Sequence, residues 1–204
     1  MASPGVKALL LILILGIPVL LYLFLQSFGE NQYQVPVMYV EGMVDPKEGC
    51  PEGTKPHTLD HLIKQGPCDL WHCSQLEGKM VLFSFMKADC NSESLSQVIR
   101  VCNQYKNIPS FLAVTISLDQ QADSGIIRDF ARQYSIQSEV LAWWSFHEAT
   151  PLVMHCGFNL EMDCSVTQKA VLLDPQSRIR GYYQLDDPQE IDRLVTEIAI
   201  LLSN

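Results

Sequence analysis

The sequence predicts an N-terminal transmembrane helix followed by a single α/β domain with a mixed sheet. An uncharged apolar run opens the chain, short apolar strands alternate with amphipathic helices from residue 78 onward, and a strand pair and a helix end it. Strands that alternate with helices form a parallel sheet covered on both faces, and the terminal strand pair adds an antiparallel edge. The 204 residues leave room for one domain beyond the anchor.

The apolar run covers residues 8–25, and its eighteen residues reach the lower limit for crossing a bilayer. A cleavable signal peptide is the alternative, but its apolar run is shorter and ends in small residues. Here the run ends in the bulky residues 23–25, so we expect an uncleaved anchor. Lys7 precedes the run and Glu30 follows it, which favours a cytoplasmic N-terminus and an external domain.

We predict three parts: the anchor over 1–29, a linker and irregular segment over 30–77, and the α/β domain over 78–204. The middle part has many Pro and Gly residues and little periodicity, apart from a short hairpin expected near residues 70–76.

The regular elements begin after Gly78. Apolar runs bounded by polar residues predict buried strands, and apolar positions three and four residues apart predict helices. The predicted strands are 80–86, 111–117, 169–174 and 178–184, and the predicted helices are 95–105, 126–134, a short one between Thr150 and Gly157, and 187–202. This is the element order of a thioredoxin-like fold. Trp143 and Trp144 are expected in the core, beneath the second helix.

The charge of the chain argues against some partners. The formal net charge is −9, and beyond Lys7 the chain carries 13 basic against 23 acidic residues, a balance of −10. Nucleic acid and anionic lipid headgroups favour clustered Lys and Arg. We therefore expect no nucleic-acid partner.

Seven cysteines are many for one small domain, and in an oxidising compartment six of them can pair. No C-x-x-C pair is present, so a zinc finger is not predicted. Cys102 lies on the apolar face of its helix and is expected in the core. A disulfide among Cys50, Cys68 and Cys73 is expected to hold the irregular segment.

Three stretches of the domain resemble the Sco/SenC proteins, membrane-anchored thioredoxin-fold copper chaperones for cytochrome c oxidase. They are GKMVLFSFMKADC (78–90), TISLDQQADSGIIRDFARQYSI (115–136) and AVLLDPQSRIRGYYQLDDPQEIDRLVTEIAILL (170–202). The resemblance implies a single-pass protein of the bacterial inner membrane, with a periplasmic domain that has a role in respiratory oxidase assembly or in thiol redox handling. Its implied partner is an oxidase subunit or another periplasmic protein.

The chain departs from that family at the copper site, which uses two cysteines in C-x-x-x-C and a distant histidine. Cys90 stands at the first position, but Ser94 and Val166 stand at the other two. Two thiolates and an imidazole suit copper, whereas a hydroxyl is a poor ligand and valine is none. The resemblance thus implies an incomplete site, and copper stays a possible cofactor only if other residues replace the missing ligands.

Cys164 and His155 are the candidate replacements. Cys164 lies two residues before the lost histidine position, so it can form a disulfide or a two-thiolate metal site with Cys90, possibly joined by His155. Cys164 can equally pair with Cys156 or stay free. Cys90 itself sits between a strand and a helix, where helix N–H groups stabilise a thiolate. The sequence therefore favours an assembly protein over an enzyme, with two alternatives: a partner-binding protein without a ligand, or a thiol oxidoreductase that uses Cys90.

Overall fold

A computed structural model describes the chain in separate stretches: residues 4–28, 34–42, 49–51, 55–64, 68, 72–87, 90, 93–119, 132 and 140–203. The chain divides into two compact units, Met1–Gln34 and Val35–Asn204.

The first unit contains one helix, α1, Pro4–Phe28, with Pro18 inside it. Between Ile12 and Phe24, its large apolar side chains are exposed. Among the residues that the structure describes, no helix is both long enough and apolar enough to cross a membrane.

The second unit is built on a five-stranded sheet in the order β3-β2-β1-β4-β5. The strands are β1 Met80–Met86, β2 Phe111–Ser117, β3 Leu141–Trp144, β4 Lys169–Leu173 and β5 Ile179–Gln184. β1, β2 and β3 run parallel, whereas β4 is antiparallel to both β1 and β5. The predicted mixed sheet of a thioredoxin-like fold is therefore confirmed.

Every residue of β1 is buried, because helices cover both faces of the sheet. Successive side chains of a strand point to opposite faces. Met80 and Leu82 accordingly belong to one apolar cluster, and Val81 and Phe83 to the other. This explains why the sequence of β1 is a continuous apolar run and not an alternating one.

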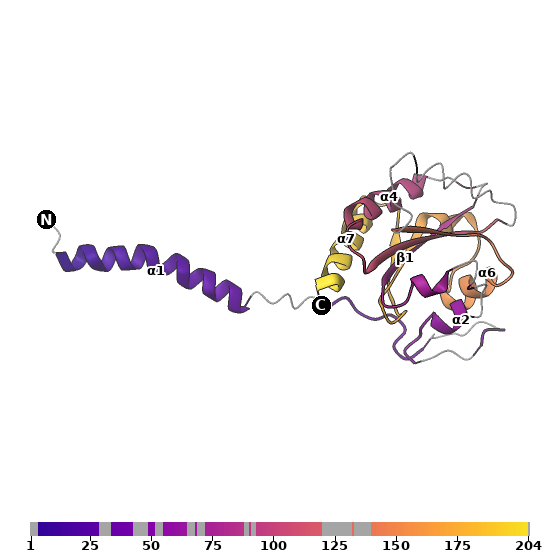
Figure 1. The fold of residues 1–204 in the computed structure, drawn as a ribbon, viewed down its shortest axis with the longest axis horizontal. Coiled ribbons are helices and arrows are strands. Elements are labelled where there is room, and N and C mark those ends of the chain that lie inside the picture. Colours follow the sequence, from indigo (N-terminus) through magenta and orange to yellow (C-terminus); the bar gives the residue numbers. More distant parts are fainter. Residues whose placement is uncertain are drawn as a thin grey trace. The chain divides into compact units, whose positions relative to one another are not determined.

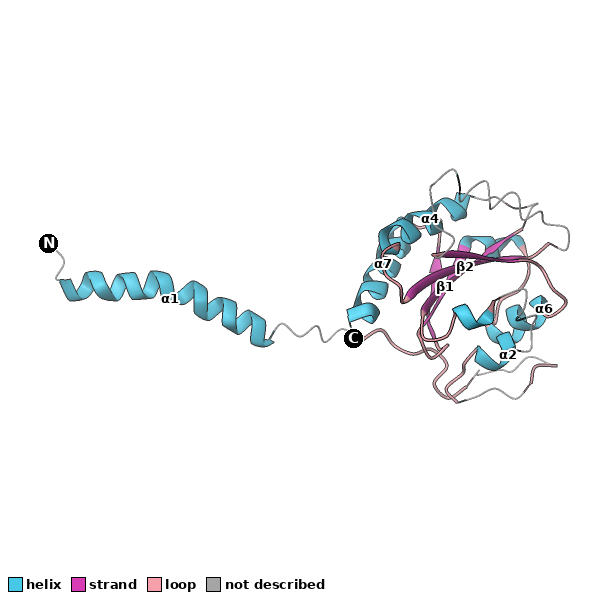
Figure 2. Ribbon diagram, in the orientation of Figure 1, coloured by secondary structure: helices cyan, strands magenta, loops and turns pink. Residues whose placement is uncertain are grey.

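Two longer helices cover the first of these faces, and shorter elements cover the second (Figures 1 and 2). The longer helices are α4, Glu93–Tyr105, and α7, Pro188–Ser203. The short elements are α2 Asp60–Lys64, the 3₁₀ turns η1 Cys73–Gln75 and η3 Cys164–Gln168, α6 Thr150–Leu152 and the π-turn η2 Val153–Gly157. The backbone N–H of Gln189 donates to Asp187 Oδ1 (2.9 Å), so Asp187 caps the N-terminus of α7.

The irregular segment is fixed to the domain by backbone bonds. The N–H of Met38 donates to the carbonyl of Ile179 (2.8 Å), and the N–H of Leu59 donates to that of Ser177 (3.0 Å). His57 is buried, and its Nε2 lies 2.9 Å from the carbonyl oxygen of Gly157. Burial lowers the pKa of His57 and so favours the neutral form of the ring.

Two sequence predictions need correction. Where a hairpin was predicted near residues 70–76, the described residues form the 3₁₀ turn η1, because Cys73 bonds back to Cys68. Residues 141–144 form strand β3, which the sequence did not reveal because four residues are too few to show a periodic apolar pattern.

Trp144 is buried as predicted, with its ring centroid 5.4 Å from that of Phe83. The helix predicted over 126–134 lies outside the described residues, apart from Arg132.

Cys102 is the one described cysteine without a disulfide, and it is fully buried in the cluster beneath α4 and α7. Burial raises the pKa of its thiol to about 12, so the thiol is protonated at neutral pH.

We expect Cys102→Ala to lower the free energy of unfolding by roughly 1–2 kcal/mol, because the lost sulfur leaves a small cavity. Cys102→Ser should cost at least as much, since it buries a hydroxyl that lacks a partner. Urea denaturation of both variants measures this. Rapid labelling of native Cys102 by a thiol reagent would contradict its burial.

Candidate functional site: the Cys90–Cys164 disulfide

Strand pairing brings two loops together at one end of the sheet. Ser84 of β1 lies opposite Ala170 of β4 in the antiparallel ladder. Cys90 follows Ser84 by six residues, and Cys164 precedes Ala170 by the same number. Because the strands run in opposite directions, equal offsets lead to the same edge.

Cys90 and Cys164 are joined there by a disulfide, with Sγ atoms 2.05 Å apart and Cα atoms 5.5 Å apart. Cys90 lies between the end of β1 and the start of α4, and its backbone N–H donates to the carbonyl of Lys87 (3.1 Å). Cys164 is the first residue of η3. The predicted pairing of Cys90 with Cys164 is thus present as a disulfide.

The two cysteines have different surroundings. Cys164 is exposed, as are its neighbours Asp163 and Ser165, whereas Cys90 is half-buried. The Asp163 carboxylate caps η3, accepting bonds from the Ser165 hydroxyl (2.6 Å) and N–H (3.0 Å). The hydroxyl bond is the main reason why the pKa of Asp163 is lowered, so a negative charge adjoins Cys164.

Cys90 lies three residues before Glu93, the first residue of α4. The first N–H groups of a helix have no partner within it, and they carry the positive end of the helix dipole. A thiolate close to these groups is stabilised. The two cysteines therefore differ in their neighbours along the chain: Cys90 precedes a helix, and Cys164 follows a residue with a carboxylate.

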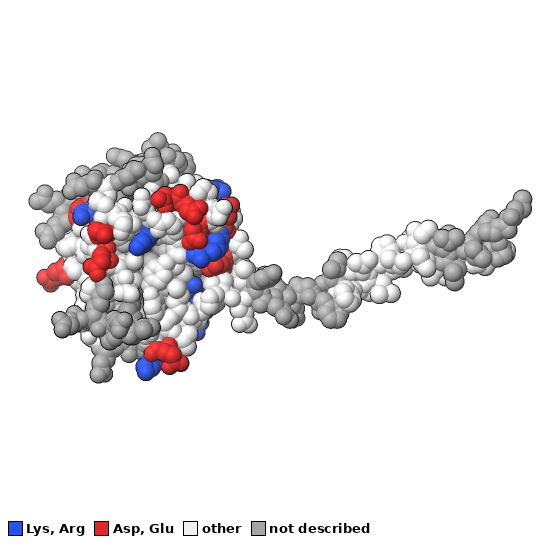
Figure 3. All heavy atoms as spheres, turned by 180° about the vertical axis from the view of Figure 1, so that it is seen from behind, with Lys and Arg blue, Asp and Glu red and all other residues white. Residues whose placement is uncertain are grey.

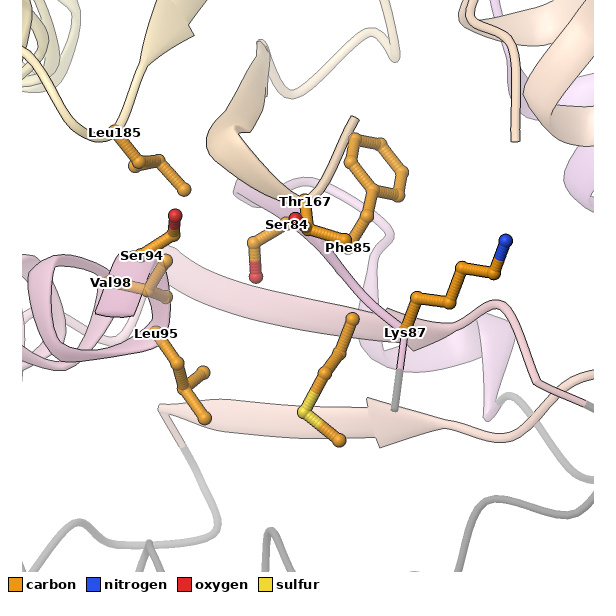
Figure 4. Close-up of a pocket in the computed structure, with 9 residues that line it drawn as sticks. Ser84, Phe85, Lys87, Ser94, Leu95, Val98, Thr167 and Leu185 are labelled. Atoms are coloured by element: carbon orange, nitrogen blue, oxygen red, sulfur yellow. The ribbon is translucent and has the colours of Figure 1, made fainter. Parts of the chain in front are cut away.

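A cavity of about 10 Å³ lies beneath this edge of the sheet (Figure 4). Three of its lining side chains carry hydroxyls, those of Ser84, Ser94 and Thr167. The Ser84 hydroxyl lies 2.9 Å from that of Thr115, and the Thr167 hydroxyl donates to the carbonyl of Cys164 (2.8 Å). Such a volume holds about one water molecule. Any reaction of the disulfide with another molecule therefore takes place at the surface.

Solved structures with the same architecture include two Sco proteins. BsSco, described as a member of the Sco family of cytochrome c oxidase assembly proteins, is 12% identical, with a TM-score of 0.51 over 63% of this chain and 82% of its own. A SCO1/SenC family lipoprotein from Bacillus anthracis is 14% identical, with a TM-score of 0.51 over 63% and 84%. The chain has a Sco-like thioredoxin fold. No protein-family model matches the sequence, and no curated protein matches it.

The Sco-like fold raises the question of copper, and the residues at this edge do not fit a Sco-type centre. Both sulfurs are bonded to each other, so neither is a thiolate ligand. Val166, at the position of the family's histidine, is buried in the core. Ser94 is buried as well and lines the water-sized cavity. Within the described stretches, no three His, Cys, Asp or Glu residues are grouped to hold a metal.

His155, the third candidate ligand, contributes to another surface of the Sco-like domain. Its Nδ1 lies 3.7 Å from Glu161 Oε1, and its side chain lines an open hollow of about 480 Å³. Cys156 also lines this hollow, but Cys90 and Cys164 do not. The structure therefore brings together two of the three predicted site residues, and His155 is paired with a carboxylate instead.

Two other disulfides hold the irregular segment. Cys68 bonds Cys73, which confirms a disulfide within the segment. Cys50 bonds Cys156 in η2, across 106 residues of sequence. The alternative in which Cys156 bonds Cys164 is therefore wrong, because each has another partner. The Cys50–Cys156 pair could not be found by spacing, since the two residues are too far apart in sequence.

We expect the oxidised chain to bind Cu(I) far more weakly than a complete three-ligand centre, because its disulfide sulfurs are not thiolates. Competition with the chelator bicinchoninate measures this. Cys164→Ala, which leaves Cys90 as a single free thiol, is the matched control. It should also give up its Cu(I) to bicinchoninate. Stoichiometric Cu(I) retained by the oxidised chain would show that ligands elsewhere form a site.

Proposed function

We propose that this protein carries out thiol–disulfide exchange through Cys90 and Cys164, in a domain held outside the cytoplasm by a membrane anchor. The observation that carries the proposal is a disulfide between Cys164, which is exposed, and Cys90, which is half-buried and precedes a helix. A disulfide reacts when an outside thiolate can reach it and when the departing thiolate is stabilised. This pair meets both conditions.

The other two disulfides meet them less well. Cys156 is buried, with 7% of its surface exposed, and Cys73 is buried with 8% exposed. The Cys68–Cys73 bond joins two parts of the irregular segment, and the Cys50–Cys156 bond joins that segment to η2. We assign them a structural role, because a thiolate from solvent reaches a buried residue poorly.

The proposed partner is a cysteine-containing protein outside the cytoplasm, such as a subunit of a respiratory oxidase. Support for the oxidase comes from one fold neighbour, BsSco, which is described as a member of the Sco family of cytochrome c oxidase assembly proteins. Since the copper ligands are not assembled here, the proposed contribution to assembly is to the redox state of the partner's thiols and not to metal delivery. On the face of the domain shown in Figure 3, basic side chains lie among acidic ones.

We further propose that α1 is a single inner-membrane anchor with its N-terminus in the cytoplasm. Its support is the sequence: residues 8–25 form an uncharged apolar run of eighteen residues, the lower limit for crossing a bilayer. Lys7 is the one charged residue in the sequence of α1. The exposed apolar side chains between Ile12 and Phe24 are suited to lipid.

We expect the oxidised full chain in detergent to oxidise a peptide that carries two thiols, forming the peptide disulfide. Cys90→Ser and Cys164→Ser should each reduce the rate to background, because either change removes the protein disulfide that accepts the two electrons. Cys102→Ala is the matched control and should retain the rate, since that thiol is buried. A Cys164→Ser chain with full activity would refute the proposal and leave the bond a structural role.

We expect the full chain to stay in the pellet when membranes are washed with alkaline carbonate, because an apolar helix in the bilayer resists extraction. A chain that begins at residue 30 should be released. Recovery of the full-length gene product in the wash, with a shortened N-terminus, would show instead that the segment is a cleaved signal peptide.

A further inference from the structure

The unequal surroundings of the two sulfurs bear on which of them bonds to the substrate. In disulfide exchange a thiolate attacks one sulfur and expels the other. Access favours attack at Cys164, because it and both of its sequence neighbours are exposed, whereas Cys90 is half-buried. Cys90 is further held to the end of β1 by its bond to Lys87.

The leaving group favours the same direction. Attack at Cys164 releases Cys90 as a thiolate, three residues before the N-terminus of the 13-residue helix α4. Attack at Cys90 would instead release a thiolate at Cys164, the residue that follows Asp163 in the chain, and a carboxylate in the vicinity disfavours a second negative charge. A better stabilised thiolate leaves faster, so the first route is favoured.

We propose that Cys164 is the substrate-bonding cysteine and Cys90 the one that leaves as a thiolate, an inference that rests on the proposed exchange function. This is the reverse of what the sequence suggests, since Cys90 alone stands at the strand-to-helix turn. A substrate thiolate bonds to Cys164 Sγ, and the electron pair of the broken bond passes to Cys90. A second substrate thiolate then attacks the substrate sulfur of this mixed disulfide and expels the Cys164 thiolate. The substrate dithiol is oxidised to a disulfide, and the Cys90–Cys164 pair is reduced by the same two electrons.

Reduced glutathione is a suitable probe for this assignment. The oxidised full chain in detergent is mixed with glutathione, quenched with acid within the first turnover and alkylated, and the position of the adduct is mapped by mass spectrometry. Cys102→Ala is carried in parallel, so that any adduct derives from a disulfide sulfur. Adducts on the other two disulfides are counted separately.

We expect glutathione on Cys164 and the alkyl group on Cys90. This pattern should exceed the opposite one, because the attacked sulfur belongs to the more exposed residue and the expelled sulfur to the residue that precedes α4. Equal labelling, or an excess on Cys90, would overturn the assignment while leaving the exchange function in place. No adduct on either cysteine, with the bond still closed, would refute the exchange function itself.

Discussion

The antiparallel pairing of β4 with β1 at the centre of the sheet is the constraint on which the rest of this structure depends. The ladder fixes Ser84 opposite Ala170, and the chain that leaves β1 therefore meets the chain that enters β4. Shifting that register by one residue would turn the side chains of β4 to the opposite faces of the sheet. Each of the two apolar clusters contains alternate residues of β4, so the shift would disrupt the packing of both. Core packing thus secures the geometry of the disulfide at the edge.

The environment of each sulfur follows from the element that carries it. The turn from β1 to α4 places Cys90 before a helix of 13 residues, and η3 places Cys164 beside its own capping carboxylate. Neither sulfur needs a dedicated binding pocket, and the cavity behind them holds no more than a water molecule. The chemistry that this edge supports is therefore exchange with a thiol that arrives from solvent.

Much of this could be predicted from the sequence, because β1, β4, β5 and α7 are long enough to show a clear apolar pattern. Strand β3 could not, since four residues show no period and Trp143 and Trp144 suit a helix or a strand in the core. The expected fold placed Cys90 and Cys164 close together. The positions of the cysteines in the sequence did not decide whether Cys164 pairs with Cys90 or with Cys156, or stays free. The Cys50–Cys156 bond depends on how the irregular segment folds back, and local sequence carries no signal for that.

The burial of Cys102 would also protect the fidelity of the proposed exchange. A thiolate attacks disulfides, so an accessible free thiol of the same chain would compete with the substrate for the Cys90–Cys164 bond. An unpaired cysteine at the surface would form non-native disulfides, either within the chain or between two copies of it. Cys102 is the one cysteine of the seven without a disulfide, and it lies on the buried face of α4, protonated and packed in the cluster that includes α7 residues. In the proposed exchange, electrons would then pass only between Cys90, Cys164 and the incoming substrate.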